Sequence, residues 1–335
     1  MPPRKPRTKT TPEASPKLLE ALRFCGSILS DKGPPQETHI TLNNRTAIAF
    51  NGILAAGYLI DEDITISPNN SLFTEALNKC GQNYSMVLLE NGTLSIKGNK
   101  FQAKIPCLDP TQLPTTLPDN PIAPIGDSLK KAIEAVGILA TEDAQRVVAA
   151  SILIRKGSVV ATNGAILFEA WHGWDLPTLA IPKAFVSPLT KQSKQLTQFG
   201  FSLSSASFFF EDNSWLKTQL YAEQWPDIDA ILNKKANYFP IPVGFWEGVA
   251  AVSPFSSDGM VYFDDGIIRS HATDGVGASF EISGLPKGPI FNYKYLSLIK
   301  PHAKEIDFLA QGTQQGSTML MFIGDEIRGN LLGRI

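Results

Sequence analysis

Thr162-Asn163-Gly164 ends one β-rich run and opens the next, and the chain repeats this pattern at Phe50-Asn51-Gly52 and Thr273-Asp274-Gly275. The three glycines are 112 and 111 residues apart. Asn-Gly and Asp-Gly pairs favour tight type I′ hairpin turns, because both residues tolerate positive φ. The spacing is too long for a solenoid unit and fits a small domain, so it predicts three copies of one domain.

Each copy is expected to contain two helices and several antiparallel strands, an α+β fold. Amphipathic helices open the copies at Pro16–Leu29, Leu129–Leu139 and Phe245–Val252. The second helical segments are expected at Ser67–Lys79, Pro182–Gln192 and Ile290–Ile299. Strands are expected at Ile53–Ile60, Met86–Leu89, Thr93–Ile96, Phe101–Ile105, Ala165–Trp171, Phe201–Ser204, Ser207–Phe210, Leu216–Tyr221, Ala278–Ile282, Ile306–Leu309, Thr318–Phe322 and Arg328–Leu332. The predicted domains span residues 15–117, 118–235 and 236–335.

Composition indicates a folded protein of a reducing compartment. Hydrophobic residues make up 43% of the 335 positions, which is enough for several cores. No run approaches the roughly 18 apolar residues that span a bilayer, and no signal-peptide core is evident. The three cysteines have no metal-ligand spacing, so we expect buried, reduced thiols. Residues 1–14 are basic and proline-rich, typical either of a solvated tail or of an arm that touches nucleic acid.

Catalytic and metal-binding motifs are missing from the sequence. The four histidines are scattered, and the acidic pairs fall in predicted turns. The sequence contains no phosphate-binding loop, dinucleotide fingerprint or nucleophile elbow. We therefore expect neither an enzyme nor a cofactor or metal site.

Basic residues gather on the predicted helices, while much of the acid lies on strands and turns. Any one lysine could simply decorate a solvated helix face. If the helices shared one side of a curved sheet, however, that side would attract a polyanion through its phosphates. The candidate DNA-facing residues are Lys17, Arg23, Lys79, Lys130, Lys131, Lys191, Lys194, Lys300 and Lys304.

Four motifs in order resemble the bacterial DNA polymerase sliding clamp, the β subunit of the replicative polymerase. Val159–Gly164 is similar to the family's strand and turn ending Ala-Thr-Asp-Gly, and Ala180–Lys183 resembles its Ile-Pro-Lys. Trp225-Pro226-Asp227 resembles Phe-Pro-Asp, and Phe291–Leu296 resembles Phe-Asn-x-x-Tyr-Leu. The resemblance covers the chain after about residue 14 and suggests a divergent, phage-encoded member.

The resemblance implies a ring of two chains closed head to tail around duplex DNA. Each domain would present two helices inward and antiparallel sheets outward. The ring would slide on DNA and tether a polymerase in the cytoplasm of a bacterial or phage-infected cell, near the nucleoid. By analogy with the family, the homodimer would close through strand edges that contain Phe101, Ala103, Phe280 and Ile282, although either strand could instead be internal.

The resemblance also implies an apolar pocket for short peptides of the polymerase and the clamp loader. Its residues would be Thr162, Gly164, Leu167, Met260, Leu331, Leu332 and Ile335. The family turn usually continues Gly-His-Arg-Leu, whereas this chain has Gly164-Ala165-Ile166-Leu167, and Met-Pro-Met-Arg-Leu is replaced by Leu331–Ile335. Loss of these donors predicts an altered peptide preference. The same residues could alternatively be ordinary core at strand ends.

Two other classes of protein fit parts of the pattern. A structural protein of β-rich repeats, such as a virion component, would share the repeats but would have no reason to place lysines on helices. An enzyme with a site between domains would escape a search for motifs. Retention on circular DNA would favour the clamp, and stabilisation by a small ligand would favour the enzyme.

Overall fold

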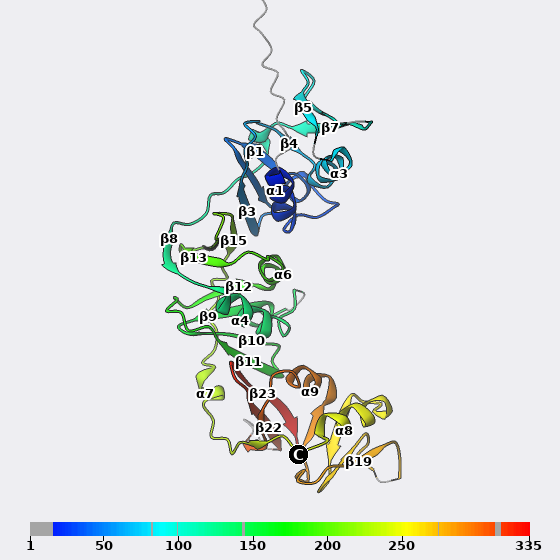
Figure 1. Ribbon diagram of the computed structural model, residues 1–335. Coiled ribbons are helices and arrows are strands. Elements are labelled where there is room, and N and C mark those ends of the chain that lie inside the picture. Colours follow the sequence, from blue (N-terminus) through cyan, green and yellow to red (C-terminus); the bar gives the residue numbers. More distant parts are fainter. Residues whose placement is uncertain (1–15, 82, 99, 143–144, 274, 312–315) are drawn as a thin grey trace, which may run out of the picture. The chain divides into compact units, whose positions relative to one another are not determined.

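The computed structural model describes residues 16–335 apart from 82, 99, 143–144, 274 and 312–315. The fold is α+β, with antiparallel strand pairing throughout (Figure 1). The chain forms two compact units. The first combines the chain up to Asp127 with Ser187–Leu220, and the second combines Ser128–Val186 with Tyr221–Ile335. The predicted basic tail, 1–14, lies outside the described residues.

The first unit contains a seven-stranded sheet in the order β1-β2-β3-β15-β14-β13-β8 and a four-stranded sheet in the order β4-β7-β6-β5. Its strands are β1 Thr41–Asn43, β2 Thr46–Phe50, β3 Leu54–Leu59, β4 Ser67–Pro68, β5 Ser85–Leu88, β6 Thr93–Lys97, β7 Gln102–Leu108, β8 Pro121–Pro124, β13 Leu196–Phe201, β14 Ser205–Phe210 and β15 Trp215–Gln219. Its helices are α1 Pro16–Gly26, α2 Pro35–Thr38 and α3 Asn70–Cys80, with α6 Val186–Thr190 at its boundary.

Helices α1 and α3 form where apolar residues recur at helical spacing. Leu18, Leu22 and Cys25 are fully buried on one face of α1, which packs against β2 and β3. Helix α3 begins at the cap Asn69, whose side chain accepts the N–H of Leu72 at 3.1 Å. The first helix was expected to end at Leu29, but α1 ends three residues earlier, at Gly26.

The second unit contains a twelve-stranded sheet whose main path runs β12-β9-β10-β11-β23-β20-β17-β18-β19; β22 also pairs with β23, and β21 joins β22 to β16. The strands are β9 Ser151–Arg155, β10 Ser158–Thr162, β11 Ile166–Trp171, β12 Leu179–Pro182, β16 Phe239–Pro240, β17 Met260–Phe263, β18 Ile267–Arg269, β19 Ser279–Glu281, β20 Ile290–Asn292, β21 Glu305–Gln311, β22 Ser317–Ile323 and β23 Ile327–Arg334. The helices are α4 Asp127–Gly137 (starting one residue before the unit), α5 Val147–Ala150, α7 Asp229–Leu232, α8 Phe245–Val252 and α9 Tyr293–Ile299. Phe245, Phe263, Phe291 and Phe308 form a linked aromatic core.

Strand pairing follows the predicted threefold repeat. The meanders β1-β2-β3, β9-β10-β11 and β17-β18-β19 have the same pairing order, and so do β5-β6-β7, β13-β14-β15 and β21-β22-β23. The two kinds of meander are joined in the same way at two places. β15 pairs with β3, and β23 pairs with β11, so in each case the last strand of one meander pairs with the last strand of the other. Residues 118–235, the predicted middle domain, contribute to both units, and the three-domain boundaries remain a prediction.

Two of the three turns that mark the repeat, at Gly52 and Gly164, are not type I′. Gly52 and Gly164 have φ of +95° and +92°, whereas Asn51 and Asn163 do not take positive φ. A glycine with positive φ at the first central position is typical of a type II′ turn. Each asparagine side chain instead accepts two backbone N–H groups, from Ile53 and Leu54 in the first case and from Ala165 and Ile166 in the second. In the third copy the loop between β18 and β19 is longer, and Asp274 lies outside the described residues.

Two other sequence predictions need correction. The strand expected at Phe201–Ser204 is β13, Leu196–Phe201, and the next three residues, Ser202-Leu203-Ser204, form the turn that leads to β14. The helix expected at Ile290–Ile299 begins as strand β20, which pairs with β17, and turns helical only at Tyr293. The cap Asn292, which accepts the N–H of Lys294 at 2.9 Å, fixes that change of conformation.

Candidate nucleic-acid interface and partner surface

The basic residues of α1 and α3 lie at the protein surface, and two of the three are ion-paired. Lys17 contacts Asp61 at 3.2 Å, and Lys79 contacts Glu75 at 2.7 Å one helical turn away. Arg23 donates to Asn78 Oδ1 at 3.0 Å, a neutral partner that leaves its charge available. These surface ion pairs are weak and can exchange with phosphates.

Lys194 holds the first unit together rather than presenting a free charge. Its side chain is only 25% exposed, forms an ion pair with Asp212 and donates to the Tyr58 hydroxyl at 2.6 Å. The ammonium also lies 4.2 Å from the Tyr58 ring. Burial alone raises the pKa of Asp212, but hydrogen bonds from Lys194 and Ser214 outweigh it and lower the pKa to about 2. We therefore leave Lys194 out of the DNA-facing set.

Three other predicted cations, Lys131, Lys191 and Lys300, are exposed and have no ion-pair partner among the described residues. Lys131 lies on α4, Lys191 follows α6 and Lys300 caps the end of α9. Lys130 is half-buried on α4, and Lys304 pairs with Asp325 at 2.6 Å. Helix α8 carries only Glu247 as a charged residue, so the basic character is uneven among the helices.

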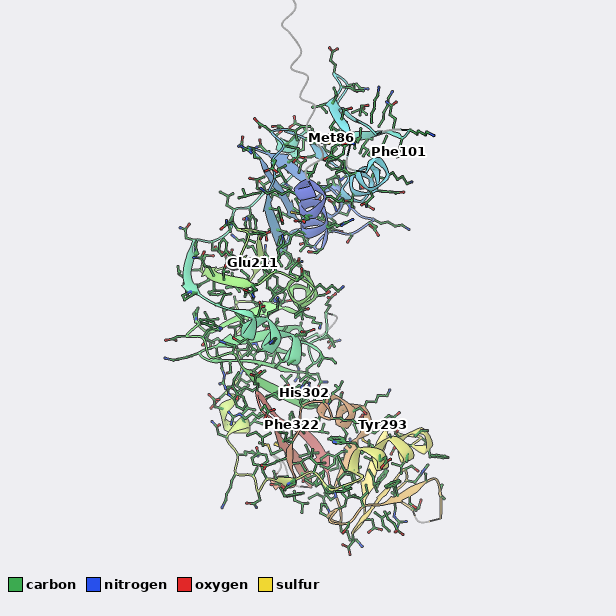
Figure 2. The ribbon with its side chains drawn as sticks, in the orientation of Figure 1. Met86, Phe101, Glu211, Tyr293, His302 and Phe322 are labelled. Atoms are coloured by element: carbon green, nitrogen blue, oxygen red, sulfur yellow. The ribbon has the colours of Figure 1, made fainter. Side chains whose placement is uncertain are left out.

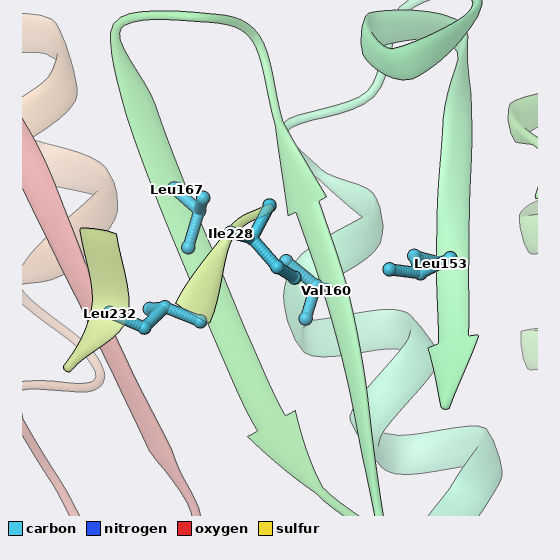
Figure 3. Packing of buried hydrophobic residues seen from close by; sticks show 5 residues of the cluster. All are labelled: Leu153, Val160, Leu167, Ile228 and Leu232. Carbon is cyan, nitrogen blue, oxygen red and sulfur yellow. The ribbon is translucent and has the colours of Figure 1, made fainter. Parts of the chain in front are cut away.

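Pairing of β11 with β23 brings together the two segments predicted to form the peptide pocket. Ile166 faces Leu331 across the two strands, and Leu332 donates its N–H to Ala165 O at 2.8 Å. Leu167 and Leu331 are 4% and 0% exposed and belong to the core. Leu167 packs with Leu153, Val160, Ile228 and Leu232, the last of these on α7 (Figure 3).

The other pocket candidates are at or near the surface. Leu332 is 39% and Ile335 is 69% exposed, and Met260, at the start of β17, is half-buried. The Thr162 hydroxyl accepts the N–H of Gly164 at 3.0 Å and donates to Ile166 O at 2.8 Å, so it is committed to its own turn. The structure thus places Leu167 and Leu331 in the core and Thr162 and Gly164 in their turn, and it leaves Met260, Leu332 and Ile335 at or near the surface.

The two strands predicted to close a dimer have open edges in the described residues. Strand β19 ends the path of its sheet, and β7 pairs with β6 along most of its length but with β4 only at Cys107 and Leu108. Phe101, labelled in Figure 2, precedes β7 and is half-buried, as are Ala103 and Phe280. Ile282 is 1% exposed and packs beside Gly248 of α8, so it is core rather than interface.

A buried charge cluster surrounds Glu169, and sequence reasoning missed it. The Glu169 carboxylate, 2% exposed, accepts from Ser158 at 2.7 Å and from Arg328 Nε at 2.7 Å, and it pairs with Arg155. Burial alone raises the pKa of Glu169, but these three donors outweigh it and lower the pKa. The only signal in the sequence is a glutamate inside an apolar strand, which needs a partner that only the fold reveals.

The described residues form neither a metal-binding cluster nor a membrane-spanning helix. No group of three or more His, Cys, Asp and Glu side chains in that part of the chain could hold a metal ion. No helix formed by these residues is long and apolar enough to cross a membrane.

Solved structures resemble the chain over nearly its whole length. A DNA polymerase sliding clamp from Caulobacter crescentus matches with a TM-score of 0.78 at 16% identity, covering 95% of this chain and 97% of that one. Clamps from Bacillus subtilis (TM-score 0.76, 13% identity) and Streptococcus pneumoniae (0.76, 17%), the latter a DNA polymerase III β chain, match with the same two coverages. No protein-family model matches the sequence, and neither does any curated protein. The resemblance predicted from four short motifs is confirmed: the chain has the α+β fold of the bacterial DNA polymerase sliding clamp.

Proposed function

We propose that the protein is a DNA sliding clamp that encircles duplex DNA, without a catalytic step of its own, and tethers a replicative polymerase. The observation that carries this proposal is the likeness to solved sliding clamps along 95% of the chain. The exposed cations Arg23, Lys131, Lys191 and Lys300 supply sequence-independent contacts to phosphates. The proposed setting is the cytoplasm of a bacterial or phage-infected cell.

The internal repeat supports ring closure by two copies of the chain. In the β3–β15 pair Ala56 faces Leu216, and in the β11–β23 pair Phe168 faces Gly329. The two pairs occupy the same position in the repeat when the residues of each strand are counted from the neighbouring hairpin turn. The third copy of this junction would need β7 and β19, whose edges are open in the described residues. Pairing β7 of one chain with β19 of another would repeat the same contact between protomers.

The repeat also fixes the register of this proposed junction. Ala103 takes the place of Leu216 and Gly329, and Ala278 takes the place of Ala56 and Phe168. Ala103 would therefore face Ala278 of the partner subunit. Phe101 would face Phe280 of the partner subunit, and Lys100 would face Glu281 of the partner subunit, so both apolar and charged side chains are matched.

Disulfide trapping tests the ring at this register. Ala103→Cys combined with Ala278→Cys places cysteines at a non-hydrogen-bonded pair, where strand backbones approach closest. Oxidation should convert the protein to covalent dimers, whereas Ala103→Cys with Glu281→Cys, three residues out of register, should not. Monomer mass by light scattering at every concentration, without cross-linking, would refute autonomous closure.

Retention on DNA tests encirclement. The oxidised Ala103→Cys, Ala278→Cys protein, closed after mixing with nicked circular DNA, should stay bound at high salt, where phosphate contacts are screened. Cutting the circle should release it, because a topological link needs no contact energy. Equal release from circular and linear DNA would exclude a sliding clamp while leaving the dimer possible.

We propose the apolar surface of Met260, Leu332 and Ile335 as the place where partner peptides bind. The side chains of Leu332 and Ile335, at 39% and 69% exposure, add little to the core of the chain and fit a short hydrophobic peptide. An acetylated pentapeptide rich in leucine and phenylalanine is a suitable probe for calorimetry. Leu332→Asp should abolish its binding, and Leu309→Asp, at an exposed leucine of β21, should not.

A further inference from the structure

A cavity of about 420 Å³ lies in the second unit among α4, the end of β11, the residues after α9 and the turn between β22 and β23. Small side chains of α4, Ala132 and Ala135, make room for it. The volume is within the range of small-molecule sites, roughly 300–1,000 Å³. The sliding and tethering roles proposed above do not use this cavity.

Two aromatic rings line the cavity. Trp171 is 36% exposed, and its backbone N–H donates to Glu326 O at 2.9 Å, which fixes its place beside the β22–β23 turn. The Arg328 guanidinium, bound to Glu169, lies 5.9 Å from the centroid of the Trp171 ring, within the range of a cation–π contact. His302, labelled in Figure 2, forms a T-shaped pair with Phe168 with 5.6 Å between the ring centroids, and burial lowers its pKa. Trp171 and His302 both line the cavity, so their rings are the candidate surfaces on which a planar ligand can stack.

The charged groups of the cavity are of opposite sign and come from different elements. Lys131 reaches it from α4 and is exposed, and Glu326 reaches it from the β22–β23 turn. The neighbouring carboxylate of Asp325 is already paired with Lys304 at 2.6 Å. Unlike the Asp325 carboxylate, the Glu326 carboxylate has no ion pair among the described residues, and it can accept hydrogen bonds from a ligand. The Lys131 ammonium can bind an anionic group of the ligand.

We propose that this cavity binds one nucleotide whose base carries an exocyclic amino group. The base stacks on Trp171 and His302, its amino group donates to Glu326, and its phosphate contacts Lys131. Aromatic side chains bind bases of any sequence by stacking, and carboxylates accept from amino groups such as that of cytosine. A ligand with a flat ring, a donor and an anion matches all three kinds of group in the lining.

Such a nucleotide has two sources, a free mononucleotide or an unpaired nucleotide of a DNA strand. Lys131 belongs to the proposed DNA-facing set, and Lys300 immediately precedes Pro301 in the cavity wall. This position favours a nucleotide of a single-stranded segment, and that assignment rests on the proposed clamp function. Binding of the free mononucleotide does not depend on the proposed clamp function.

Calorimetric titration of the full chain tests the site, with dCMP and dTMP as probes. dCMP should bind at least about tenfold more tightly than dTMP, which lacks an amino group. Trp171→Leu should weaken dCMP binding at least about tenfold, whereas Trp246→Leu, at a half-buried tryptophan of α8 outside the cavity, should not. Glu326→Ala should bring dCMP and dTMP to similar affinities. The oligonucleotides dC10 and dT10 then separate the two sources: a preference for dC10 over dCMP assigns the site to a DNA strand.

The results for nucleotide binding can be distinguished from the results for dimer formation and DNA encirclement. Trp171→Leu and Glu326→Ala should leave the mass in solution and retention on duplex circles unchanged, since neither residue belongs to the proposed junction or DNA-facing set. Absence of dCMP binding, or binding that Trp171→Leu does not change, would overturn the nucleotide site even if the ring forms. Binding of dCMP by a protein that fails to encircle DNA would retain the site and reject the clamp.

Discussion

Arg328 on β23 donates from Nε to Glu169 Oε2 on β11 at 2.7 Å, and the two residues face each other in the strand register. Arg155 of β9 and Ser158 of β10 bind the same carboxylate. One buried acid therefore ties four neighbouring strands, across the boundary predicted between the second and third repeats. The three cysteines are free thiols, and the cluster acts together with the backbone pairing and the ring contacts of Phe168 with His302 and Phe322 across the same boundary.

Glu169→Gln should destabilise the protein strongly. The change keeps the shape but removes the buried counter-charge of Arg328, 24% exposed, and leaves Arg155, 19% exposed, with only the exposed Asp229 at 2.7 Å, which costs about 3 kcal/mol. Urea unfolding measures the difference. Asp175→Asn, which breaks the exposed Lys156–Asp175 pair, is the control and should cost less than about 1 kcal/mol. Equal effects from the two variants would mean that the cluster contributes no more than a surface ion pair.

Stability should fall as the pH drops below neutrality, in part because of His172. Its Nδ1 accepts the Trp174 N–H at 3.0 Å and its Nε2 lies 3.2 Å from Arg155 O, an arrangement that needs the neutral ring. Burial lowers its pKa below the ordinary 6.5. The unfolded chain thus binds the proton first, and the stability present above about pH 6.5 is lost toward the folded pKa.

Thermal unfolding from pH 7.5 to pH 5 checks the sign of this dependence. The midpoint of the natural chain should decrease over that range, and His172→Gln should show a shallower decrease from a lower starting value. His39 and His302, whose pKa values burial also lowers, keep part of the slope in that variant. A midpoint that rises on acidification would contradict the assignment.

Charge reversal of the exposed cations should weaken duplex binding without unfolding the chain. Each of Lys131→Glu, Lys191→Glu and Lys300→Glu should remove one phosphate interaction, and so reduce the slope of log affinity against log salt by about 0.9. Lys156→Glu, at a lysine of the β9–β10 turn outside the proposed set, is the matched control and should leave the slope unchanged. Lys194→Glu should instead destabilise the fold, because it opposes Asp212.

A charge exchange tests the register of the proposed junction between protomers. Lys100→Glu alone should lower the dimer fraction in a dilution series, because it would oppose Glu281 of the partner subunit. Combining Lys100→Glu with Glu281→Lys should restore much of that fraction. If the double variant dimerises no better than the single ones, the two residues do not face each other.

Local pattern predicted the repeat and most elements, but it did not predict the type of the hairpin turns at Gly52 and Gly164. Helix α8 has the bounds expected from its apolar spacing, Phe245–Val252, and the strands of the last meander lie where alternation placed them. The turns at Gly52 and Gly164 differ from type I′ because the side chains of Asn51 and Asn163 accept the backbone N–H groups that follow, and the Asn-Gly dipeptide alone does not predict these hydrogen bonds.

The candidate surfaces were less predictable because residues distant in the sequence decide how their side chains lie. Its position after a predicted helix favours a DNA-facing Lys194, but Asp212 and Tyr58 bind the Lys194 ammonium in the structure. Ile282 was assigned to an edge, yet the register turns its side chain toward Gly248. Both misplacements concern the direction of a side chain, which depends on pairing register rather than on position along the sequence.

Continuity of the sheets through backbone pairing has a consequence for how such chains diverge. Main-chain hydrogen bonds require no particular side chain, so the pairs β3–β15 and β11–β23 can persist while nearly every residue in them changes. The pleat, the size of the side chains and the few buried charges then remain as the constraints on sequence. This explains how the chain can share its architecture with the clamps compared above at only 13–17% identity.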